Sequence, residues 1–286
     1  MPELPEVETI KLGLEAKIKG LKIEKIQILT AKSFSGAIAS ITGAKISTVA
    51  RRAKLLLIGL DNNKTIIIHL KMTGQLILEA SSQQQGARII GGHPTTNMFS
   101  VLPNSTTRAV FNLSDGSKLF FNDQRMFGWI KVVNNDQLPI INQKLGPEPL
   151  GEEFSWTLLK TQLLKRKATP VKVVLMDQEI VAGIGNIYAS EACFIAGLDP
   201  RRKVLTITDG DFQRLHQGVI QSLTESLKQG GSTRSHFKNI NGERGNFLEH
   251  AFVYGKNGQP CKVCAVDVEK VTLGGRGTYL CSQCQK

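Results

Sequence analysis

The chain has 286 residues, of which 41% are hydrophobic, and it carries a formal net charge of +12. This length predicts two or three compact units with real cores, whereas apolar runs such as Leu55–Ile58 are far too short to cross a membrane. The start MPELPEVETI does not have the pattern of a secretory signal, so a cytoplasmic protein is expected. The excess of Lys and Arg favours a polyanionic partner such as nucleic acid, although solubility alone also accounts for it.

The first predicted element is a helix over residues 5–19. Pro5 can occupy the first helical position, where a missing N–H costs nothing. Glu6 and Glu8 fall in the first turn, where the helix dipole favours carboxylates, and apolar residues then follow at helical spacing.

Short strands are predicted over residues 21–133. Turn residues at 61–63 and at 115–116 each separate two apolar segments, which is typical of hairpins. Residues 80–107 are polar and rich in turn formers, so a surface loop is expected there. The sequence therefore predicts a β-sandwich or flattened barrel as an N-terminal domain over residues 1–135.

Residues 136–150 are predicted to be a linker, because the paired prolines Pro147 and Pro149 resist both helix and sheet. A helical domain is then expected over residues 151–230. Its helices are predicted at 153–165, 170–181, 186–196 and 208–228. The fold class is accordingly α+β.

Four cysteines near the C-terminus have the spacing C-x2-C, sixteen residues, C-x2-C. In an intracellular chain this pattern indicates a tetrahedral zinc site formed by Cys261, Cys264, Cys281 and Cys284. A redox dithiol or a chance pair of motifs are the alternatives. The glycine-rich segment 274–277 between the pairs favours a hairpin, so residues 251–286 are predicted to be a zinc-finger hairpin. Four thiolates leave no open position, which makes the zinc ion structural.

The segment 181–186 places two glycines before a predicted helix start. Glycines let the backbone approach a ligand closely, and a helix start offers free N–H groups to an anion. Asn186 can add a side-chain donor. Glycine turns between helices are common, so this feature by itself is also compatible with a plain turn.

The N-terminus offers a candidate nucleophile. Removal of Met1 leaves Pro2 with a secondary amine, and an α-amino group has a pKa near 8, so part of it is neutral at working pH. Glu3 can act as a general acid beside it, and Glu6 can belong to the same network. Taken alone, the stretch favours a simple helix start over a nucleophile.

Motifs from the whole chain occur together in a characteristic order. They are MPELPEVE at the start, Arg-Arg-Ala-Lys at 51–54, His-Leu-Lys-Met-Thr-Gly at 69–74, Gly-Ile-Gly-Asn-Ile-Tyr-Ala at 183–189, and the four cysteines. In these motifs the chain resembles the formamidopyrimidine-DNA glycosylase family, which also contains endonuclease VIII. The resemblance covers essentially all 286 residues.

The resemblance implies a bifunctional DNA glycosylase and AP lyase of base excision repair. Such an enzyme removes oxidised purines (8-oxoguanine and formamidopyrimidines) from duplex DNA through a Schiff base and β,δ-elimination. It implies an N-terminal β-sandwich domain with an N-terminal helix, and a helix–two-turn–helix DNA-binding domain with a zinc-finger hairpin. It also implies a lesion-recognition loop over residues 231–250. Its partner is duplex DNA with oxidised bases or abasic sites. We expect a monomer that needs no membrane and no obligate protein partner. We expect it in a bacterial-type cytoplasm, associated with the nucleoid.

The resemblance also assigns roles to individual residues. Pro2 is the implied nucleophile and Glu3 the general acid, with Glu6 in the same catalytic network. Lys54 assists β-elimination, and Arg276 grips the phosphates beside the lesion and serves δ-elimination. The implied DNA contacts are His69, Met72, Arg125, Phe127, Lys167, Lys172 and Asn186. Of these, Met72, Arg125 and Phe127 fill the void left by the everted nucleotide; His69 has a buried structural role as its alternative.

Several positions depart from the family pattern. The usual Asp-Pro-Arg-Arg-Phe-Gly is Asp-Gln-Arg-Met-Phe-Gly at 123–128, which removes one basic residue and weakens a phosphate contact. Thr106 replaces a histidine, the loop at 80–105 is extended, and Ala265 stands where a glycine often follows the second cysteine.

Three other functions are compatible with parts of the sequence. An endonuclease VIII-type glycosylase for oxidised pyrimidines is the nearest of them. A catalytically inactive damage-binding paralogue would not need Pro2, Glu3 and Lys54. A zinc-ribbon transcription factor would explain the cysteines and the charge but not the N-terminus.

Overall fold

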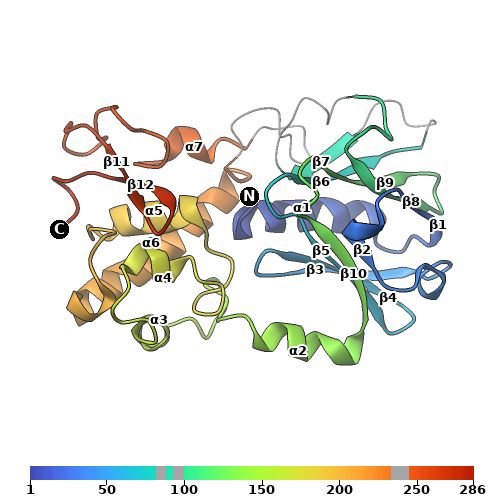
Figure 1. Cartoon of the computed structure of the whole chain (residues 1–286), viewed down its shortest axis with the longest axis horizontal. Helices are drawn as coiled ribbons and strands as arrows, with labels where there is room; N and C mark the ends of the chain where they lie inside the picture. The colour runs from blue at the N-terminus through green and yellow to red at the C-terminus, as the bar shows by residue number, and fades with distance from the viewer. Residues whose placement is uncertain (82–87, 93–99, 233–244) are drawn as a thin grey trace. The chain divides into compact units, whose positions relative to one another are not determined.

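A computed structural model of the chain describes residues 1–81, 88–92, 100–232 and 245–286, which form two compact units (Figure 1). Unit 1 comprises Met1–Asn142 and Gly230–Asn246, and unit 2 comprises Gln143–Gln229 and Phe247–Lys286. Unit 1 combines a helix with two sheets, whereas unit 2 combines helices with a hairpin. The predicted α+β class is confirmed.

Unit 1 begins with helix α1 (Leu4–Ile18), in agreement with the predicted helix. Glu3 is its N-cap, and Pro5 lies in the first turn. The apolar face of α1 packs against the sheets of unit 1, mainly against β3 (Ile46–Arg52) and β7 (Arg88–Gly92). The N-terminus of the chain is thereby fixed to the sandwich.

Two five-stranded sheets form the sandwich of unit 1 (Figure 1). The first has the order β1 (Ile23–Ile28), β8 (Thr107–Leu113), β9 (Lys118–Asp123), β6 (Gly74–Glu79), β7. The second has the order β2 (Phe34–Ser35), β10 (Trp129–Asn134), β5 (Lys64–His69), β4 (Leu55–Leu60), β3. Leu56 and Ile68 of one sheet share a core with Leu76 and Phe121 of the other and with Leu14 of α1. Both predicted hairpins are present, as β4–β5 and β8–β9.

The segment 80–107 is not the single loop that the sequence predicts. Strand β7 lies within it and pairs with β6 from Gln75 opposite Gly92 to Glu79 opposite Arg88. The β-branched pair Ile89-Ile90 favours a strand, but polar neighbours on both sides hide this signal. The rest of the prediction falls partly on residues 82–87 and 93–99, which lie outside the described residues.

The predicted linker 136–150 is partly helical. Helix α2 (Leu138–Gln143) occupies its first half, and Pro139 stands at the second helical position, where its missing N–H costs nothing. Just before α2, the backbone N–H of Asn134 donates to the side-chain oxygen of Gln137 (3.1 Å). Residues 145–149 have no regular structure, as the paired prolines predict.

The helices of unit 2 are α3 (Trp156–Leu164), α4 (Val171–Leu175), α5 (Asn186–Ile195), α6 (Asp209–Lys228) and α7 (Phe247–His250). Strands β11 (Glu269–Leu273) and β12 (Arg276–Leu280) form its hairpin. Residues of α3 to α6 share one core, in which Tyr188 is fully buried. No helix in the described part of the chain is long and apolar enough to cross a membrane.

The predicted helix 170–181 is wrong in length, because α4 ends at Leu175. The side chain of Gln178 organises the turns that follow. Its amide nitrogen donates to the carbonyls of Met176 (2.8 Å) and Ile184 (2.7 Å), and its amide oxygen accepts from the N–H of Gly183 (2.9 Å). One side chain therefore replaces helical hydrogen bonds and brings α4 and α5 into a helix–two-turn–helix arrangement.

Candidate active site

The first group of predicted residues gathers around the chain start in unit 1. Pro2 and Glu3 are buried. Burial lowers the pKa of the Met1 amino group; the charges of Glu3 and Glu6 oppose this effect, and the charge of Lys54 adds to it. An amine, two carboxylates and a lysine thus lie within electrostatic reach of one another.

Lys54 reaches this group from the tight turn between β3 and β4, where Arg52 pairs with Leu55. Ala53 adopts a left-handed conformation (φ 53°) in the turn. Arg51 donates to the carbonyl of Ala53 (3.2 Å) and to the carboxylate of Glu8 on α1 (2.7 Å), which ties the turn to the first helix. Burial lowers the pKa of Lys54, the charges of Glu3 and Glu6 oppose this, and Lys71 adds to it.

Glu6 is engaged by backbone groups on both of its oxygens. One oxygen accepts from the N–H of Glu3 (2.8 Å) and the other from the N–H of Ser232 (2.8 Å). These bonds hold the start of α1 and the chain at residue 232 in place. The geometry therefore favours a positioning role for Glu6 beside the predicted general acid.

His69 ends strand β5, with its ring tilted against Trp129 at a centroid distance of 5.7 Å. Its Nδ1 accepts from the N–H of Lys71 (3.0 Å), so the hydrogen of the neutral ring is on Nε2. Burial lowers the pKa of His69 to about 3, and the charges of Lys71 and Lys54 add to this. At neutral pH the ring is an uncharged hydrogen-bond donor, which still suits a phosphate oxygen.

The three predicted void-filling residues lie on two neighbouring loops of unit 1. Met72 follows β5, whereas Arg125 and Phe127 follow β9. The N–H of Arg125 donates to the hydroxyl of Thr73 (3.0 Å), which joins the loops. The Arg125 guanidinium lies over the Phe127 ring at 4.7 Å, and the side chains of Met72 and Phe127 are 42% and 52% exposed. Large apolar side chains held in water at a loop tip are suited to inserting into DNA.

In unit 2, Lys172 and Asn186 belong to one network. The fully buried ammonium of Lys172 donates to the side-chain oxygens of Asn186 (2.5 Å) and Thr278 (2.8 Å). Asn186 donates in turn to the carbonyl of Gly277 (3.0 Å). The phosphate contact of Lys172 stays a prediction, and in this structure its ammonium is enclosed and fixes Asn186 against the hairpin.

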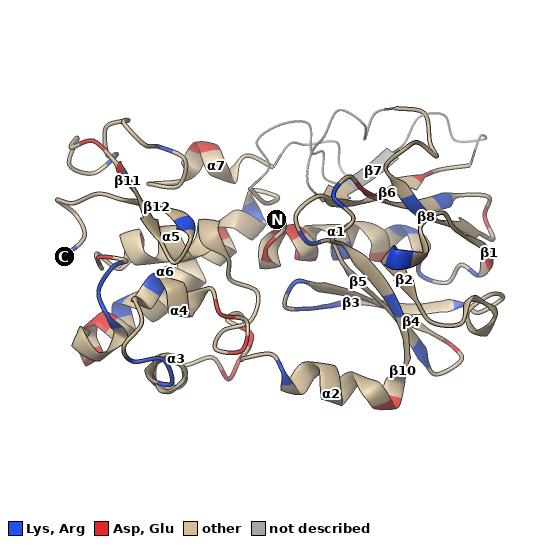
Figure 2. Cartoon of the chain, viewed as in Figure 1, with Lys and Arg blue, Asp and Glu red and all other residues tan. Residues whose placement is uncertain are grey.

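Arg276 is exposed at the tip of the β11–β12 hairpin. Gly274 and Gly275 form its two-residue turn, with φ angles of 56° and 72° that favour glycine. A Cβ at Gly274 would lie 2.9 Å from Val173 of α4, so the turn packs closely on that helix. Lys167 is also exposed, and basic residues are spread over both units (Figure 2).

Glu191 and Asp123 are buried carboxylates that the sequence reasoning missed. Glu191 on α5 accepts from the N–H groups of Phe252 (2.7 Å), Val253 (3.0 Å) and Tyr254 (2.8 Å), and so holds the chain that leads to the cysteines. Its signal was a charged residue inside an otherwise apolar helix. Asp123 organises the loop of Arg125 and Phe127, and no local signal distinguished it from a turn residue.

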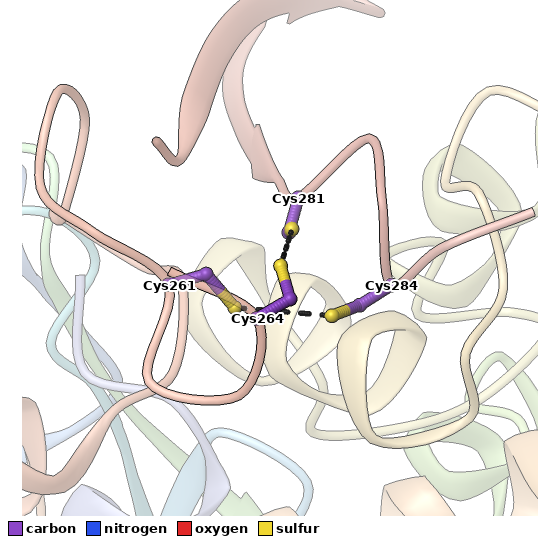
Figure 3. Close-up of side chains that lie close together, drawn as sticks. All are labelled: Cys261, Cys264, Cys281 and Cys284. Carbon is purple, nitrogen blue, oxygen red and sulfur yellow. Dashed lines mark hydrogen bonds between the residues drawn. The ribbon is translucent and has the colours of Figure 1, made fainter. Parts of the chain in front are cut away.

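The four cysteines of unit 2 converge (Figure 3). Their sulfur atoms lie within 4.8 Å of one another, with Cys261 and Cys284 at 3.9 Å and Cys264 and Cys281 at 3.4 Å. Tetrahedral Zn–S bonds of about 2.3 Å require S···S separations of about 3.8 Å. The N–H of Val263 also points at the Cys261 sulfur (3.5 Å), as in a zinc knuckle. The donor set therefore fits one structural zinc ion, as predicted.

Three family models match the chain in order. The formamidopyrimidine-DNA glycosylase N-terminal domain matches residues 1–130 and its H2TH domain matches residues 145–238. A zinc finger found in FPG and IleRS matches residues 258–286. The matches extend over both described units.

Curated relatives are similar over their whole length. A formamidopyrimidine-DNA glycosylase of Pelotomaculum thermopropionicum is 39% identical over 293 residues, covering 100% of this chain and 99% of the relative. One of Streptococcus mutans is 35% identical over 292 residues, with full coverage of both.

Solved structures show the same fold. Wild-type Lactococcus lactis Fpg in complex with N7-benzyl-Fapy-dG DNA has a TM-score of 0.85 at 30% identity, with 100% of both chains covered. Lactococcus lactis Fpg in complex with DNA containing an abasic site has a TM-score of 0.85 at 29% identity, with 99% of both chains covered.

Proposed function

The chain belongs to the formamidopyrimidine-DNA glycosylase family, and from this premise we propose that Pro2 is the nucleophile of an enzyme that excises oxidised purines from duplex DNA. The protein is a DNA glycosylase of base excision repair, and AP lyase activity is typical of its family. One observation above all supports the assignment of Pro2: Pro2 and Glu3 are buried, and the adjoining Met1 amine lies within electrostatic reach of Glu3, Glu6 and Lys54. Such an amine is neutral, and hence nucleophilic, at a lower pH than one in water.

In the proposed reaction the Pro2 nitrogen bonds to C1′ of the damaged nucleotide as the C1′–N bond to the base breaks. Glu3 donates a proton to the departing base or to the opening sugar ring. The nitrogen then loses its proton as the C1′–O4′ bond breaks and the ring oxygen takes up a proton, which gives an iminium and makes the C2′ hydrogen acidic. Loss of the C2′ proton breaks the C3′–O bond, and loss of the C4′ proton in a second elimination breaks the C5′–O bond. Water then hydrolyses the iminium and frees Pro2.

Other residues hold the DNA or the site. Lys54 stands beside the amine and is positioned to assist proton transfer during β-elimination. Asn186, Lys167, His69 and the exposed Arg276 supply phosphate contacts, and Met72, Arg125 and Phe127 fill the void. Lys172 acts through Asn186, since its ammonium is enclosed by Asn186 and Thr278.

The remaining expectations are proposals as well. The enzyme works as a monomer in the cytoplasm with the nucleoid, and the segment 231–250 covers the everted base. Most of that segment, residues 233–244, lies outside the described residues. Two described residues on either side of this gap, Gly230 and Gly245, are in close contact.

Borohydride trapping and a lesion panel test the proposed function. The processed protein is expected to form a covalent adduct with a duplex containing an abasic site, because borohydride reduces the iminium. It is expected to release 8-oxoguanine and formamidopyrimidines faster than thymine glycol. Faster release of thymine glycol would favour the endonuclease VIII alternative. Absence of any adduct would favour a damage-binding paralogue.

Lys54 is expected to set the pH dependence of adduct formation. Only the neutral amine attacks, so the rate rises with pH through the amine pKa. At the Met1 amine of this structure burial lowers the pKa most and the charge of Lys54 lowers it further, and we expect the same direction of effect at the neighbouring Pro2 amine once Met1 is removed. Lys54→Met therefore moves the acidic limb of the trapping profile to higher pH, whereas Lys54→Arg keeps the charge and leaves the limb near its original position. Initial rates of trapping on abasic duplex, measured between pH 5 and 9 as an approximate range around the α-amino pKa, give the comparison. An unchanged limb in Lys54→Met would show that Lys54 does not tune the amine.

A further inference from the structure

We propose that Thr73 and Asp123 form a clamp that holds the Met72 loop and the Arg125–Phe127 loop as one rigid wedge. This rigidity sets the rate of base excision from duplex DNA and the dependence of that rate on the base opposite the lesion. The inference rests on the proposed function, in which these loops enter the DNA. The residues meant by the clamp are Thr73 and Asp123 alone.

Asp123 spans its own loop. It is the last residue of β9 and is fully buried. One carboxylate oxygen accepts from the N–H of Gly128 (2.6 Å), and the other accepts from the N–H of Arg125 (3.2 Å). The beginning and the end of the loop are therefore tied to a single carboxylate, and Arg125 and Phe127 lie between the two ties.

Thr73 connects this loop to its neighbour. Its hydroxyl donates to Asp123 and accepts from the N–H of Arg125 (3.0 Å). Thr73 follows Met72 directly, and the turn that carries both closes with a hydrogen bond from the N–H of Gly74 to the carbonyl of Leu70 (2.8 Å). Movement of the Arg125 backbone away from Thr73 must break its N–H bonds to Thr73 and Asp123, and leaving the buried Asp123 carboxylate short of a partner costs free energy.

Both loops contain backbone that needs such support. Lys71 and Met126 adopt left-handed conformations, with φ angles of 49° and 54°, which are disfavoured for residues with a Cβ. Met72, Met126 and Phe127 also keep large apolar side chains in water, at 40% exposure or more. Unsupported loops of this kind collapse onto nearby apolar surface, so the clamp preserves a conformation that suits insertion rather than packing.

The consequence differs between two substrates of the same site. Excision from a duplex requires the wedge to occupy the void and Arg125 to contact the orphaned base while the nucleotide is everted. A single-stranded abasic site requires neither. Loosening the clamp should therefore slow excision and reduce the dependence on the opposite base, yet leave Schiff-base formation on single-stranded abasic DNA unchanged.

Thr73→Val and Thr73→Ser form a matched pair for the test. Valine has the shape of threonine without the hydroxyl, whereas serine keeps the hydroxyl. Thr73→Val is expected to slow single-turnover excision of 8-oxoguanine from duplex by about tenfold, as for loss of a hydrogen bond to a charged group. The ratio of rates opposite two different bases should fall toward one. Thr73→Ser should retain most of both values.

Asp123→Asn probes the other half of the clamp. Asparagine has only one side-chain oxygen, so its NH₂ group faces one of the two backbone N–H groups that now donate to Asp123. Two donors cannot bond to each other, and one tie of the loop is therefore lost. We expect a similar loss in excision, and the double variant with Thr73→Val should lose less than the product of the two single losses.

Trapping on single-stranded abasic DNA separates the possible outcomes. Retained trapping with slowed, less selective excision supports the clamp. Excision by Thr73→Val equal to that of the unmodified protein overturns it, as does an equal loss of excision and single-strand trapping. Failure of the unmodified protein to trap at all would instead contradict the proposed function.

Discussion

A protein that retains Met1 is expected to lose borohydride trapping on abasic duplex by at least about a hundredfold, while keeping most of its affinity for DNA. With Met1 present, the Pro2 nitrogen is an amide and has no nucleophilic lone pair. The free amine then belongs to Met1, one residue before Pro2, and is displaced by up to about 3.8 Å from the position of the Pro2 nitrogen. Misplacement of a reacting group by about 1 Å can cost a factor of about a hundred.

The buried setting of the chain start sharpens this expectation. Glu3 caps α1 and donates its own N–H to Glu6, so a shift of the residues after Pro2 that would bring the Met1 amine to the position of the Pro2 nitrogen must break these bonds. The DNA contacts proposed for Asn186 and Arg276 belong to unit 2 and do not involve the chain start. Affinity should therefore survive when trapping is lost.

Pro2→Gly supplies the matched control. Its initiator Met is removed as readily, and its amine is primary but stands at the position of the Pro2 amine. It should trap more slowly than the normal protein and far faster than the Met1-retaining form. Intact-mass measurement verifies the state of Met1 in each sample. Equal trapping with and without Met1 would rule out Pro2 as the nucleophile.

The extent to which the sequence predicts this site depends on the range of the interactions. The start of α1, the β4–β5 and β8–β9 hairpins and the cysteine pairs are specified by residues close together in the chain. Proline at a helix start, turn residues between apolar runs and C-x2-C spacing each have a local physical meaning. These features appear in the structure where the sequence places them.

Features that depend on distant partners were predicted poorly. Helix α4 ends early because Gln178 bonds to Ile184 and Gly183, and no helix propensity records those bonds. Lys172 resembles a surface cation in sequence, but Thr278, 106 residues away, helps to enclose it. The resemblance to a family supplied candidate roles for residues, whereas the structure supplied the partners that explain how each is held.

Removal of zinc is expected to lower DNA affinity on the order of a hundredfold, because two proposed phosphate contacts depend on the hairpin and a charge-assisted contact contributes about 1.5–3 kcal/mol. The hairpin is small, and its core of Phe194, Val253 and Val268 includes two of the cysteines. A two-stranded hairpin is marginal alone, and structural zinc contributes roughly 10–16 kcal/mol in zinc-finger peptides. Without the ion, Arg276 loses its support.

Asn186 is the second proposed phosphate contact that depends on the hairpin. Its amide donates to Gly277, and Lys172 bridges it to Thr278, both on the hairpin. Loss of the hairpin leaves the buried Lys172 charge with one partner fewer, which destabilises the turn that presents Asn186. Chelation should therefore weaken binding through the helix–two-turn–helix segment as well as through Arg276.

Arg276→Ala and Thr278→Val separate these two routes. Both variants keep all four cysteines, so both should retain one zinc ion per chain by metal analysis. Arg276→Ala should lose about tenfold in affinity through its own contact, and Thr278→Val should lose less, through Asn186. The zinc-free protein should lose at least the product of these two factors in a mobility-shift titration, and added zinc should restore binding. A chelated protein that binds and cuts DNA like the zinc form would show that the hairpin contributes to neither route, and Arg276 would then have to be withdrawn from the proposed site.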